Sequence, residues 1–327
     1  MKIGTIGSGF IVKNILGCVA ETEGISCEAV YSRSEERGRK LADEFQVKKV
    51  YTDLDVMCQD PEIDFIYVAS PNTLHYEQTK KALMYGKHVI CEKPFTPSAS
   101  EAQELISLAK ERHLFLFEAI TTLYHPNYHW IQEHLGEIGQ LKMITCTFCQ
   151  YSSRYDALMN GELPNIFNPE FAGGSLMDIN MYNIHFVAGL LGRPDRIEYF
   201  AGKYENGVDL HGTLIMQYGD VICQCIGAKD CWCDNEVQIL GDKGWISVEP
   251  GSSNCQKVRL VRKGMEDIQI ELDENQWLYE IKELERLVRE KDYDTCYRNL
   301  EKTLEVVRIL EQARRIPCIG ICIQQMK

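Results

Sequence analysis

A lysine ends a run of apolar, β-prone residues at His88-Val89-Ile90-Cys91-Glu92-Lys93-Pro94. Such a run is typical of a buried parallel strand, and ligands of open α/β sheets bind at the carboxyl ends of their strands. An ammonium group at that edge could stabilise negative charge on a reacting oxygen. Lys93 is therefore a catalytic candidate. The alternative is a solvated Glu-Lys pair in a surface loop.

A second set of chemically capable side chains consists of Asp178, Tyr182 and His185. Their spacings of four and three place them on one face of a helix that we predict over 175–191, after a pair of glycines. A stripe of titratable groups on a helix could transfer protons. As an alternative, Ser175-Leu176-Met177-Asp178 fits a capping box, in which Asp178 only caps the helix.

The first of these sites requires a sheet to position it, and the N-terminus begins with a strand–turn–helix pattern. The turn is Gly7-Ser8-Gly9-Phe10-Ile11, directly after a short apolar strand. Glycines at such a turn let the backbone approach a pyrophosphate, which lies at the helix N-terminus. We expect a dinucleotide here, although an ordinary strand-to-helix turn would look similar.

The second predicted strand, 27–31, ends in Ser32-Arg33, and Arg37 follows one helical turn later. An acidic residue that would bind the ribose of NAD is replaced by Ser32 at this point. A guanidinium suits the 2′-phosphate of NADP, so the sequence favours NADP, with NAD possible because two glutamates are close by. Alternatively, the segment is only a helix start with Ser34 as its N-cap.

Two more strand ends complete the first half of the chain. One strand leads into Ser70-Pro71-Asn72 with His75 in the next helix, and the other is the strand before Lys93. Strands and helices that alternate at this length predict a doubly wound parallel sheet. We assign residues 1–121 to this Rossmann domain.

Beyond residue 121 the strands become consecutive, with hairpins predicted at 212–226 and 237–248. Consecutive hairpins indicate a large, mainly antiparallel open sheet, so we assign 122–327 to an α+β substrate-binding and oligomerisation domain. Helices are expected at 277–290 and 300–315. For the apolar segment 316–326 we expect only a packing role. The helices are too few to cover both faces of the sheet, which predicts a homodimer or larger assembly.

The chain has 327 residues, 14 cysteines and a net charge of −13. This charge argues against nucleic acid or an anionic membrane as partner, because no basic stripe is present to offset phosphates. Without a long apolar run or a signal peptide, a cytoplasmic location is expected. Neither the cysteine spacing nor the pair His125 and His129 provides a complete set of metal ligands, so no metal site is predicted.

Taken together, these motifs resemble the oxidoreductase family of glucose–fructose oxidoreductase, inositol dehydrogenase and rhizopine-catabolism proteins (Gfo/Idh/MocA). The resemblance rests most on Pro71-Asn72…His75 followed by Glu92-Lys93-Pro94. It implies an NAD(P)-dependent dehydrogenase or reductase for a sugar, cyclic polyol or related hydroxyl compound, with Lys93 beside the nicotinamide. Asp178 and Tyr182 match the subgroup that carries tyrosine, while Asn180 stands where glycine is usual. The cofactor-binding residues would be Gly7, Ser8, Gly9, Phe10, Ile11, Ser32, Arg33, Arg37, Ser70, Pro71, Asn72, His75, Glu92 and Lys93.

The mechanism that we expect is hydride transfer at a carbinol or carbonyl carbon, with Tyr182 exchanging a proton with the substrate oxygen. Lys93 would favour the phenolate and the developing alkoxide, and Asp178 would orient the lysine or the substrate. His185 is the alternative acid or base. Two other functions fit the same sequence: a non-catalytic dinucleotide-binding sensor, and a relative that cleaves glycosides with NAD as redox catalyst.

Overall fold

The computed structural model describes residues 1–316, which form two compact units. The first unit contains Met1–Ile120 and Glu274–Leu304, and the second contains Thr121–Asp273 and the chain from Glu305. The sequence predicts that residues 274–304 belong to the second domain, whereas in the structure this segment groups with the first unit. The reason is packing: helix α10 (Gln276–Arg289) lies against α1 (Phe10–Ala20), with the Phe10 and Trp277 rings 6.4 Å apart. Apart from Ile316, the apolar segment 316–326 lies outside the described residues.

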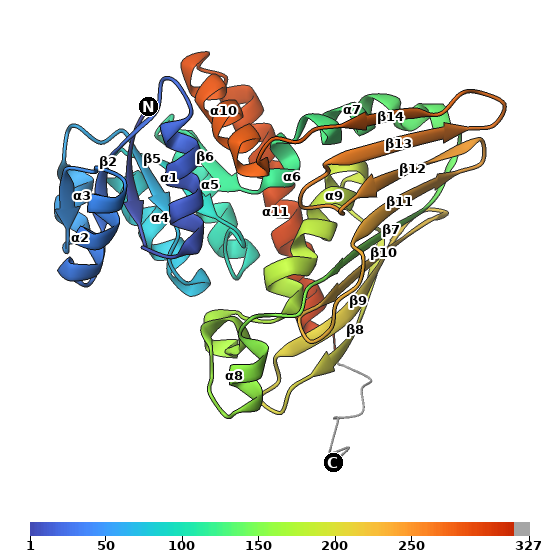
Figure 1. The fold of residues 1–327 in the computed structure, drawn as a ribbon, viewed down its shortest axis with the longest axis horizontal. Coiled ribbons are helices and arrows are strands. Elements are labelled where there is room, and N and C mark those ends of the chain that lie inside the picture. The colour runs from blue at the N-terminus through green and yellow to red at the C-terminus, as the bar shows by residue number, and fades with distance from the viewer. Residues whose placement is uncertain (317–327) are drawn as a thin grey trace. The chain divides into compact units, whose positions relative to one another are not determined.

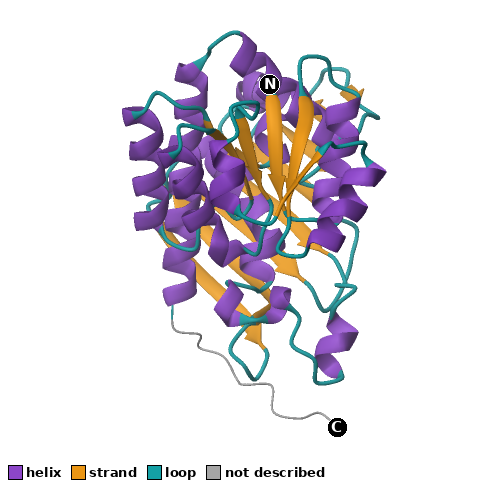
Figure 2. Ribbon diagram, turned by 90° about the vertical axis from the view of Figure 1, so that its left-hand side faces the viewer, coloured by secondary structure: helices purple, strands orange, loops and turns teal. Residues whose placement is uncertain are grey.

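The first unit is built on a six-stranded parallel sheet with the order β3-β2-β1-β4-β5-β6. Helices lie on both sides of these strands (Figure 2). The strands are β1 (Lys2–Ile6), β2 (Ser26–Tyr31), β3 (Lys49–Tyr51), β4 (Phe65–Val68), β5 (His88–Glu92) and β6 (Leu116–Ala119). The helices between them are α2 (Glu35–Glu44), α3 (Leu54–Gln59), the short η1 (Asn72–Leu74), α4 (His75–Met84) and α5 (Ala99–Glu111).

The strand order of this sheet reverses between β1 and β4, which is the point where such sheets bind dinucleotides. Gly7 follows β1 there with φ +112°, and a Cβ on it would lie 2.6 Å from the Ala69 carbonyl oxygen. Only glycine fits this conformation and this close approach. A Cβ on Gly9 would meet nothing within 4 Å, so the space in front of α1 is open.

The second unit is built on an eight-stranded sheet with the order β14-β13-β12-β11-β7-β10-β9-β8. All neighbours are antiparallel except β7 and β10, which are parallel. Helix α9 (Met181–Leu191) lies on one face of the sheet (Figure 1). The strands are β7 (Leu141–Cys149), β8 (Arg196–Lys203), β9 (Asp209–Tyr218), β10 (Val221–Ala228), β11 (Glu236–Gly241), β12 (Gly244–Glu249), β13 (Lys257–Arg262) and β14 (Ile268–Glu271). The predicted fold class, a Rossmann sheet followed by an α+β domain, is confirmed.

The helix predicted over 175–191 begins with a wide π-helical turn, η5 (Leu176–Asn180), and continues as α9 (Met181–Leu191). In this turn the Asn180 side-chain amide donates to the Cys225 carbonyl of β10 at 3.0 Å. A Cβ on Gly227 would lie 2.6 Å from the Asn180 Cβ, so the glycine in β10 makes room for the asparagine. Such π-turns occur frequently at functional sites.

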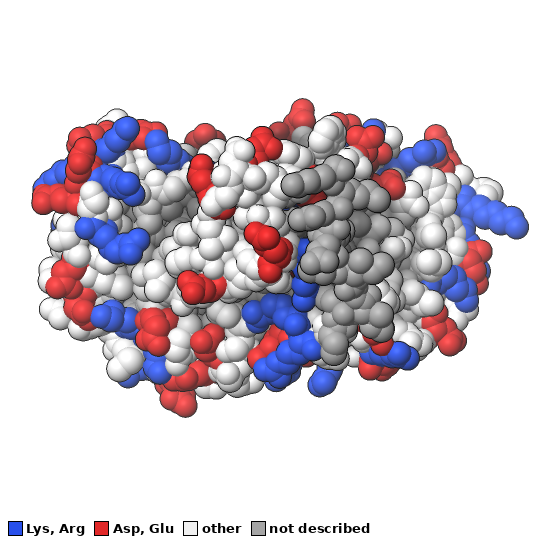
Figure 3. Space-filling view, turned by 90° about the horizontal axis from the view of Figure 1, so that it is seen from below, with Lys and Arg blue, Asp and Glu red and all other residues white. Residues whose placement is uncertain are grey.

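The remaining helices of the second unit are short, apart from one that the two units share. They are α6 (Thr121–Tyr124), α7 (Pro126–His134), η2 (Leu135–Ile138), α8 (Tyr155–Met159), η3 (Asn165–Phe167) and η4 (Pro169–Phe171), and the shared helix is α11 (Tyr293–Arg315). Among the described residues, none of the helices combines the length and the apolar character needed to cross a membrane. Acidic and basic side chains are interspersed on the face that Figure 3 shows.

Candidate functional site

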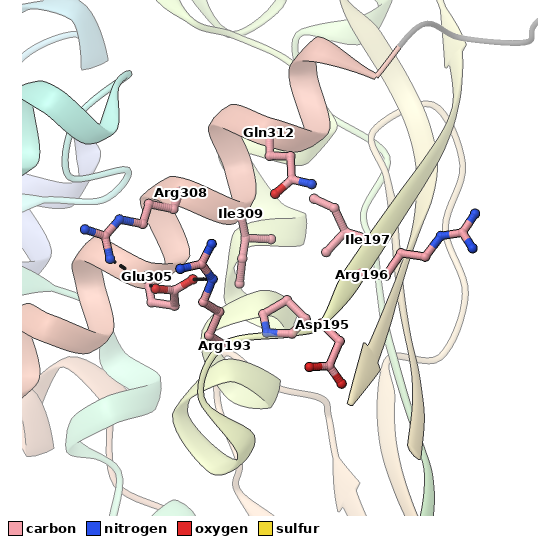
Figure 4. Close-up of a pocket in the computed structure, with 9 residues that line it drawn as sticks. Arg193, Asp195, Arg196, Ile197, Glu305, Arg308, Ile309 and Gln312 are labelled. Carbon is pink, nitrogen blue, oxygen red and sulfur yellow. Dashed lines mark hydrogen bonds and ion pairs between the residues drawn. The ribbon is translucent and has the colours of Figure 1, made fainter. Parts of the chain in front are cut away.

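A cavity of about 430 Å³ lies in the second unit, between the start of β8 and α11. None of the predicted catalytic residues lines it. Figure 4 shows Arg193 and Arg308 directed at Glu305, which they approach to 3.7 and 3.3 Å. The arginines of this hollow therefore have a carboxylate partner within the chain, and we assign it no function.

The first unit has another cavity, of about 410 Å³, at the point where the strand order of its sheet reverses. This is where the sequence predicts the cofactor. Seven of the predicted cofactor-binding residues line it: Gly7, Ser8, Ser32, Arg33, Arg37, Ser70 and Pro71. The cavity thus collects residues from the ends of β1, β2 and β4, as expected for a dinucleotide site. Gly9, Phe10, Ile11 and Asn72 do not line it. The first three lie at the start of α1, and Asn72 opens η1.

Both arginines of the cavity come from the segment after β2. Ser34 is indeed the N-cap of α2, since its hydroxyl accepts from the Arg37 N–H at 3.4 Å. The capping alternative is therefore correct, and it coexists with the cavity. By fixing the start of α2, the cap places Arg33 and Arg37 beside the same hollow.

The cavity also holds polar atoms that a ligand could satisfy. The Ser70 hydroxyl oxygen and Gln78 Oε1 are buried and have no hydrogen-bond partner among the described residues. A nucleotide would supply such partners, so these residues fit a dinucleotide. Sequence reasoning missed Gln78, although it lies four residues after Leu74 and therefore on the same side of the helix.

His75 was predicted to bind the cofactor, but its side chain is buried and does not line the cavity. Its Nδ1 lies 2.9 Å from the Pro94 carbonyl oxygen and its Nε2 lies 2.8 Å from the Ser70 carbonyl oxygen. Burial lowers the pKa of the ring, and a neutral imidazole has one N–H, so it donates to one of these at a time. His75 thus connects the ends of β4 and β5 and does not line the cavity.

Glu92 and Lys93 lie at the end of β5, where the sequence predicted them. Glu92 is buried, accepts from the Tyr67 hydroxyl, and its Oε2 accepts from the Lys93 backbone N–H at 3.3 Å. Burial raises the pKa of the Glu92 carboxyl to about 7, although the hydrogen bond from Tyr67 and the positive charge of Lys93 both lower it. Glu92 is therefore a buried support of the strand end, while Lys93 itself is half-buried.

The raised pKa of Glu92 predicts a pH-dependent effect of Glu92→Gln on stability. The native state keeps the Glu92 proton up to about pH 7, whereas the unfolded chain loses it near pH 4.5, so stability falls as the pH rises through this window. A glutamine avoids this cost. Urea titrations should show a gain of about 2–3 kcal/mol in the free energy of unfolding at pH 8 and little change at pH 4.

The matched control is Glu111→Gln, at the exposed end of α5, which should leave stability unchanged at both pH values. Equal effects of Glu92→Gln at pH 4 and pH 8 would contradict the assignment of Glu92 as a buried, protonatable carboxyl.

In the second unit, Asp178 and Tyr182 are half-buried on the helix formed by η5 and α9. The Tyr182 ring lies 5.8 Å from the Phe148 ring of β7, tilted by 54°. His185 lies in the same helix but is buried, with 1% of its surface exposed. The predicted stripe therefore divides: Asp178 and Tyr182 can reach a ligand, and His185 belongs to the core.

The start of this helix is capped by Asp209 of β9. Its carboxylate accepts from the Leu176 N–H at 2.7 Å and from the Tyr199 hydroxyl at 2.8 Å. Ser175 makes no side-chain cap hydrogen bond, so the capping-box alternative is wrong. Burial raises the pKa of the Asp209 carboxyl. Asp178 is thus not needed as a cap.

Asp178 contacts Lys229, which directly follows β10. The two form a hydrogen-bonded ion pair through Asp178 Oδ2, and the Lys229 ammonium lies 6.0 Å from the centre of the Phe167 ring. Sequence reasoning missed Lys229 because it lies 51 residues from Asp178 and no motif marks it.

Comparisons with known proteins agree with this geometry. The model of the oxidoreductase family with an NAD-binding Rossmann fold matches residues 1–119, and that of the GFO/IDH/MocA C-terminal domain matches 132–247. The scyllo-inositol 2-dehydrogenase (NADP(+)) IolU of Bacillus subtilis is 34% identical over 316 residues, with 96% of each chain covered. The uncharacterized oxidoreductase YgjR of Escherichia coli is 35% identical over 319 residues, with the same coverage.

Among solved structures, the 3-ketoreductase KijD10 of Actinomadura kijaniata, in complex with NADP and TDP-benzene, superposes with a TM-score of 0.85. It covers 97% of each chain at 22% sequence identity, and this likeness shows the fold. The two family models match both halves of the chain, in the order that its two sheets follow. The chain therefore belongs to the Gfo/Idh/MocA family of oxidoreductases.

Proposed function

We propose that the chain is an NADP-dependent dehydrogenase or reductase that acts on a CH–OH group of a sugar or cyclic polyol. The observation that carries this proposal is the cavity at the switch point, with Arg33 and Arg37 beside Ser32 and Ser70. The similarity to an NADP-dependent scyllo-inositol dehydrogenase along 96% of the chain supports the substrate class.

The cofactor, when bound, supplies the hydride transfer, and the residues of the chain supply position and charge. Arg33 and Arg37 would hold the 2′-phosphate, while the turn around Gly7 and the start of α1 would hold the pyrophosphate. Lys93 stabilises the negative charge that develops on the substrate oxygen. Tyr182 gives or takes the proton of that oxygen, and Asp178 accepts hydrogen bonds from substrate hydroxyls.

Cofactor preference gives the direct test of the cavity. Arg33→Ala should raise the dissociation constant of NADPH by about 10–100-fold, because a charge-assisted hydrogen bond of about 1.5–3 kcal/mol is lost. Binding of NADH, which lacks the 2′-phosphate, should change little. Fluorescence titration with both cofactors measures this.

The control is Arg39→Ala, since Arg39 lies on α2 but pairs with Glu35 at 3.6 Å and does not line the cavity. Tighter binding of NADH than of NADPH by the wild type, unaffected by Arg33→Ala, would contradict the NADP assignment.

We also propose that the chain forms a homodimer or a larger assembly through the open face of the eight-stranded sheet. Strand register aligns one apolar row across this face: Val261, Trp245, Leu240, Met143 and Ile222. Met143 and Ile222 keep 41% and 46% of their surface exposed. A row of this kind on a sheet face favours association with a second copy.

A charge in this row should weaken the assembly. Met143→Glu is expected to shift the protein toward monomer in sedimentation velocity at micromolar concentration, because it places a carboxylate in an apolar contact. Met84→Glu, at a methionine of α4 that is more exposed than Met143, should have no effect. A wild type that sediments as a monomer would refute the proposal.

We also propose a cytoplasmic location. The cysteines among the described residues are free, as is usual for proteins of a reducing compartment.

A further inference from the structure

The ion pair between Asp178 and Lys229 is buried unevenly. The Lys229 side chain keeps 4% of its surface exposed, whereas the Asp178 side chain keeps 24%. A molecule in solution can therefore contact the Asp178 side chain, whereas the Lys229 side chain is almost completely covered. Any effect of Lys229 on a ligand must act through Asp178.

The backbone of Lys229 is fixed on both sides. Its N–H donates to the Leu210 carbonyl of β9 at 2.8 Å, and its carbonyl accepts from the Ser152 N–H at 2.8 Å. The side chain runs to Phe167, which is fully buried in a small apolar cluster with Leu158, Val208 and Leu210. Lys229 is thus a rigid cation at a defined place.

A buried lysine is costly unless an anion compensates its charge, and Asp178 provides that anion. Conversely, the lysine fixes the position of the carboxylate, on the wide turn of η5. Asp178 is half-exposed and one helical turn before Tyr182, the residue that we propose as the proton donor.

We propose that Lys229 is a positioning residue of the substrate site: it holds the Asp178 carboxylate ionised and oriented, so that Asp178 can bind substrate hydroxyls. This inference rests on the proposed function. Because the lysine already neutralises the aspartate, the site is suited to uncharged hydroxyl groups and does not require a cationic substrate. Three neighbouring titratable groups accompany the pair: Asp209 at the helix start, and the His211–Asp230 pair beside Lys229.

The role has a signature that a merely structural lysine would lack. Lys229→Met removes the cation that is hydrogen-bonded to Asp178, which should raise the pKa of the aspartate. Carbon-13 NMR of the aspartate carboxyls, assigned with Asp178→Asn, measures this without any turnover. Lys229→Arg keeps the charge and should restore the wild-type titration.

Turnover gives the second readout, with scyllo-inositol and NADP⁺ as the probes. Lys229→Met should lower kcat/KM about a hundredfold, the scale for a misplaced reacting group, while NADPH binding stays unchanged. Lys229→Arg should recover most of the activity. Lys110→Met, which breaks an ion pair with Glu301 in the first unit, is the control and should change neither quantity.

A mutant cycle keeps the test valid if Lys229→Met alone fails to fold. Asp178→Asn with Lys229→Met removes both charges, so the double variant avoids an unpaired buried ion. Since Lys229 acts through Asp178, the double variant should have the same kcat/KM as Asp178→Asn alone. A further large loss in the double variant would overturn the proposal.

An unchanged Asp178 titration in Lys229→Met would also overturn it. If the wild type turns over neither scyllo-inositol nor any other cyclic polyol or sugar, the proposed substrate class fails, but the NMR titration still decides whether Lys229 acts on Asp178.

Discussion

Replacement of Lys93 by methionine is expected to lower kcat by about a hundredfold or more, the scale for the loss of one preorganised charge-stabilising group. Lys93 directly follows β5 at the carboxyl edge of the parallel sheet and is half-buried. Methionine keeps the length of the apolar stem and removes the charge. Steady-state kinetics with scyllo-inositol and NADP⁺ would measure the loss.

Binding of NADPH to Lys93→Met should remain close to that of the wild type, because Lys93 does not line the cavity that contains Arg33 and Arg37. Lys80→Met, which breaks an exposed ion pair with Glu104 on α5, is the control and should retain full turnover. Normal turnover of Lys93→Met would exclude the lysine from the chemistry. A wild type that binds NADPH but reduces or oxidises no sugar, polyol or diketone would favour the sensor function.

The second large effect is expected of Tyr182→Phe, which removes only the hydroxyl oxygen. The ring that packs near Phe148 remains, so the fold should be unaffected, while the loss of a general acid or base should lower kcat about a hundredfold or more. Tyr85→Phe, on the exposed end of α4, serves as the control.

His185→Ala separates the two candidates for the proton transfer. Because His185 is buried, the substitution should lower the melting temperature. The kcat of the folded variant should fall less than that of Tyr182→Phe. If Lys93 and Tyr182 act in the same step, as we propose, the double variant of Lys93→Met with Tyr182→Phe should lose much less than the product of the single effects. Near-normal turnover of Tyr182→Phe beside an inactive His185→Ala would make histidine the acid or base.

Local motifs explain which parts of the molecule could be predicted from the sequence. The turn at Gly7, the strand end at Lys93 and the hairpins of the second sheet depend on residues that are close together in the chain. Their periodicity and turn residues therefore predict the fold class and seven of the residues that line the cavity at the switch point.

The features that the sequence did not reveal depend on contacts between distant segments. Lys229 meets Asp178 across 51 residues, and Asp209 caps the Leu176 N–H across 33 residues. A lysine after one strand and an aspartate at the start of another carry no pattern that would pair them with a helix. The burial of His185 was missed for a related reason: helical spacing gives the face of a residue, but not how deeply the neighbouring strands cover it.

The division of the chain has a consequence for recombining parts of this enzyme with those of its relatives. Because residues 274–304 return to the first unit, the second unit is largely an insertion between β6 and α10. A fragment that stops near residue 121 would lose α10, against which α1 packs, and would expose the side of α1 that this helix covers. A chimaera that exchanges substrate specificity while keeping the cofactor half therefore has to replace an internal segment at two junctions, and a terminal exchange at residue 121 would produce an incomplete nucleotide-binding unit.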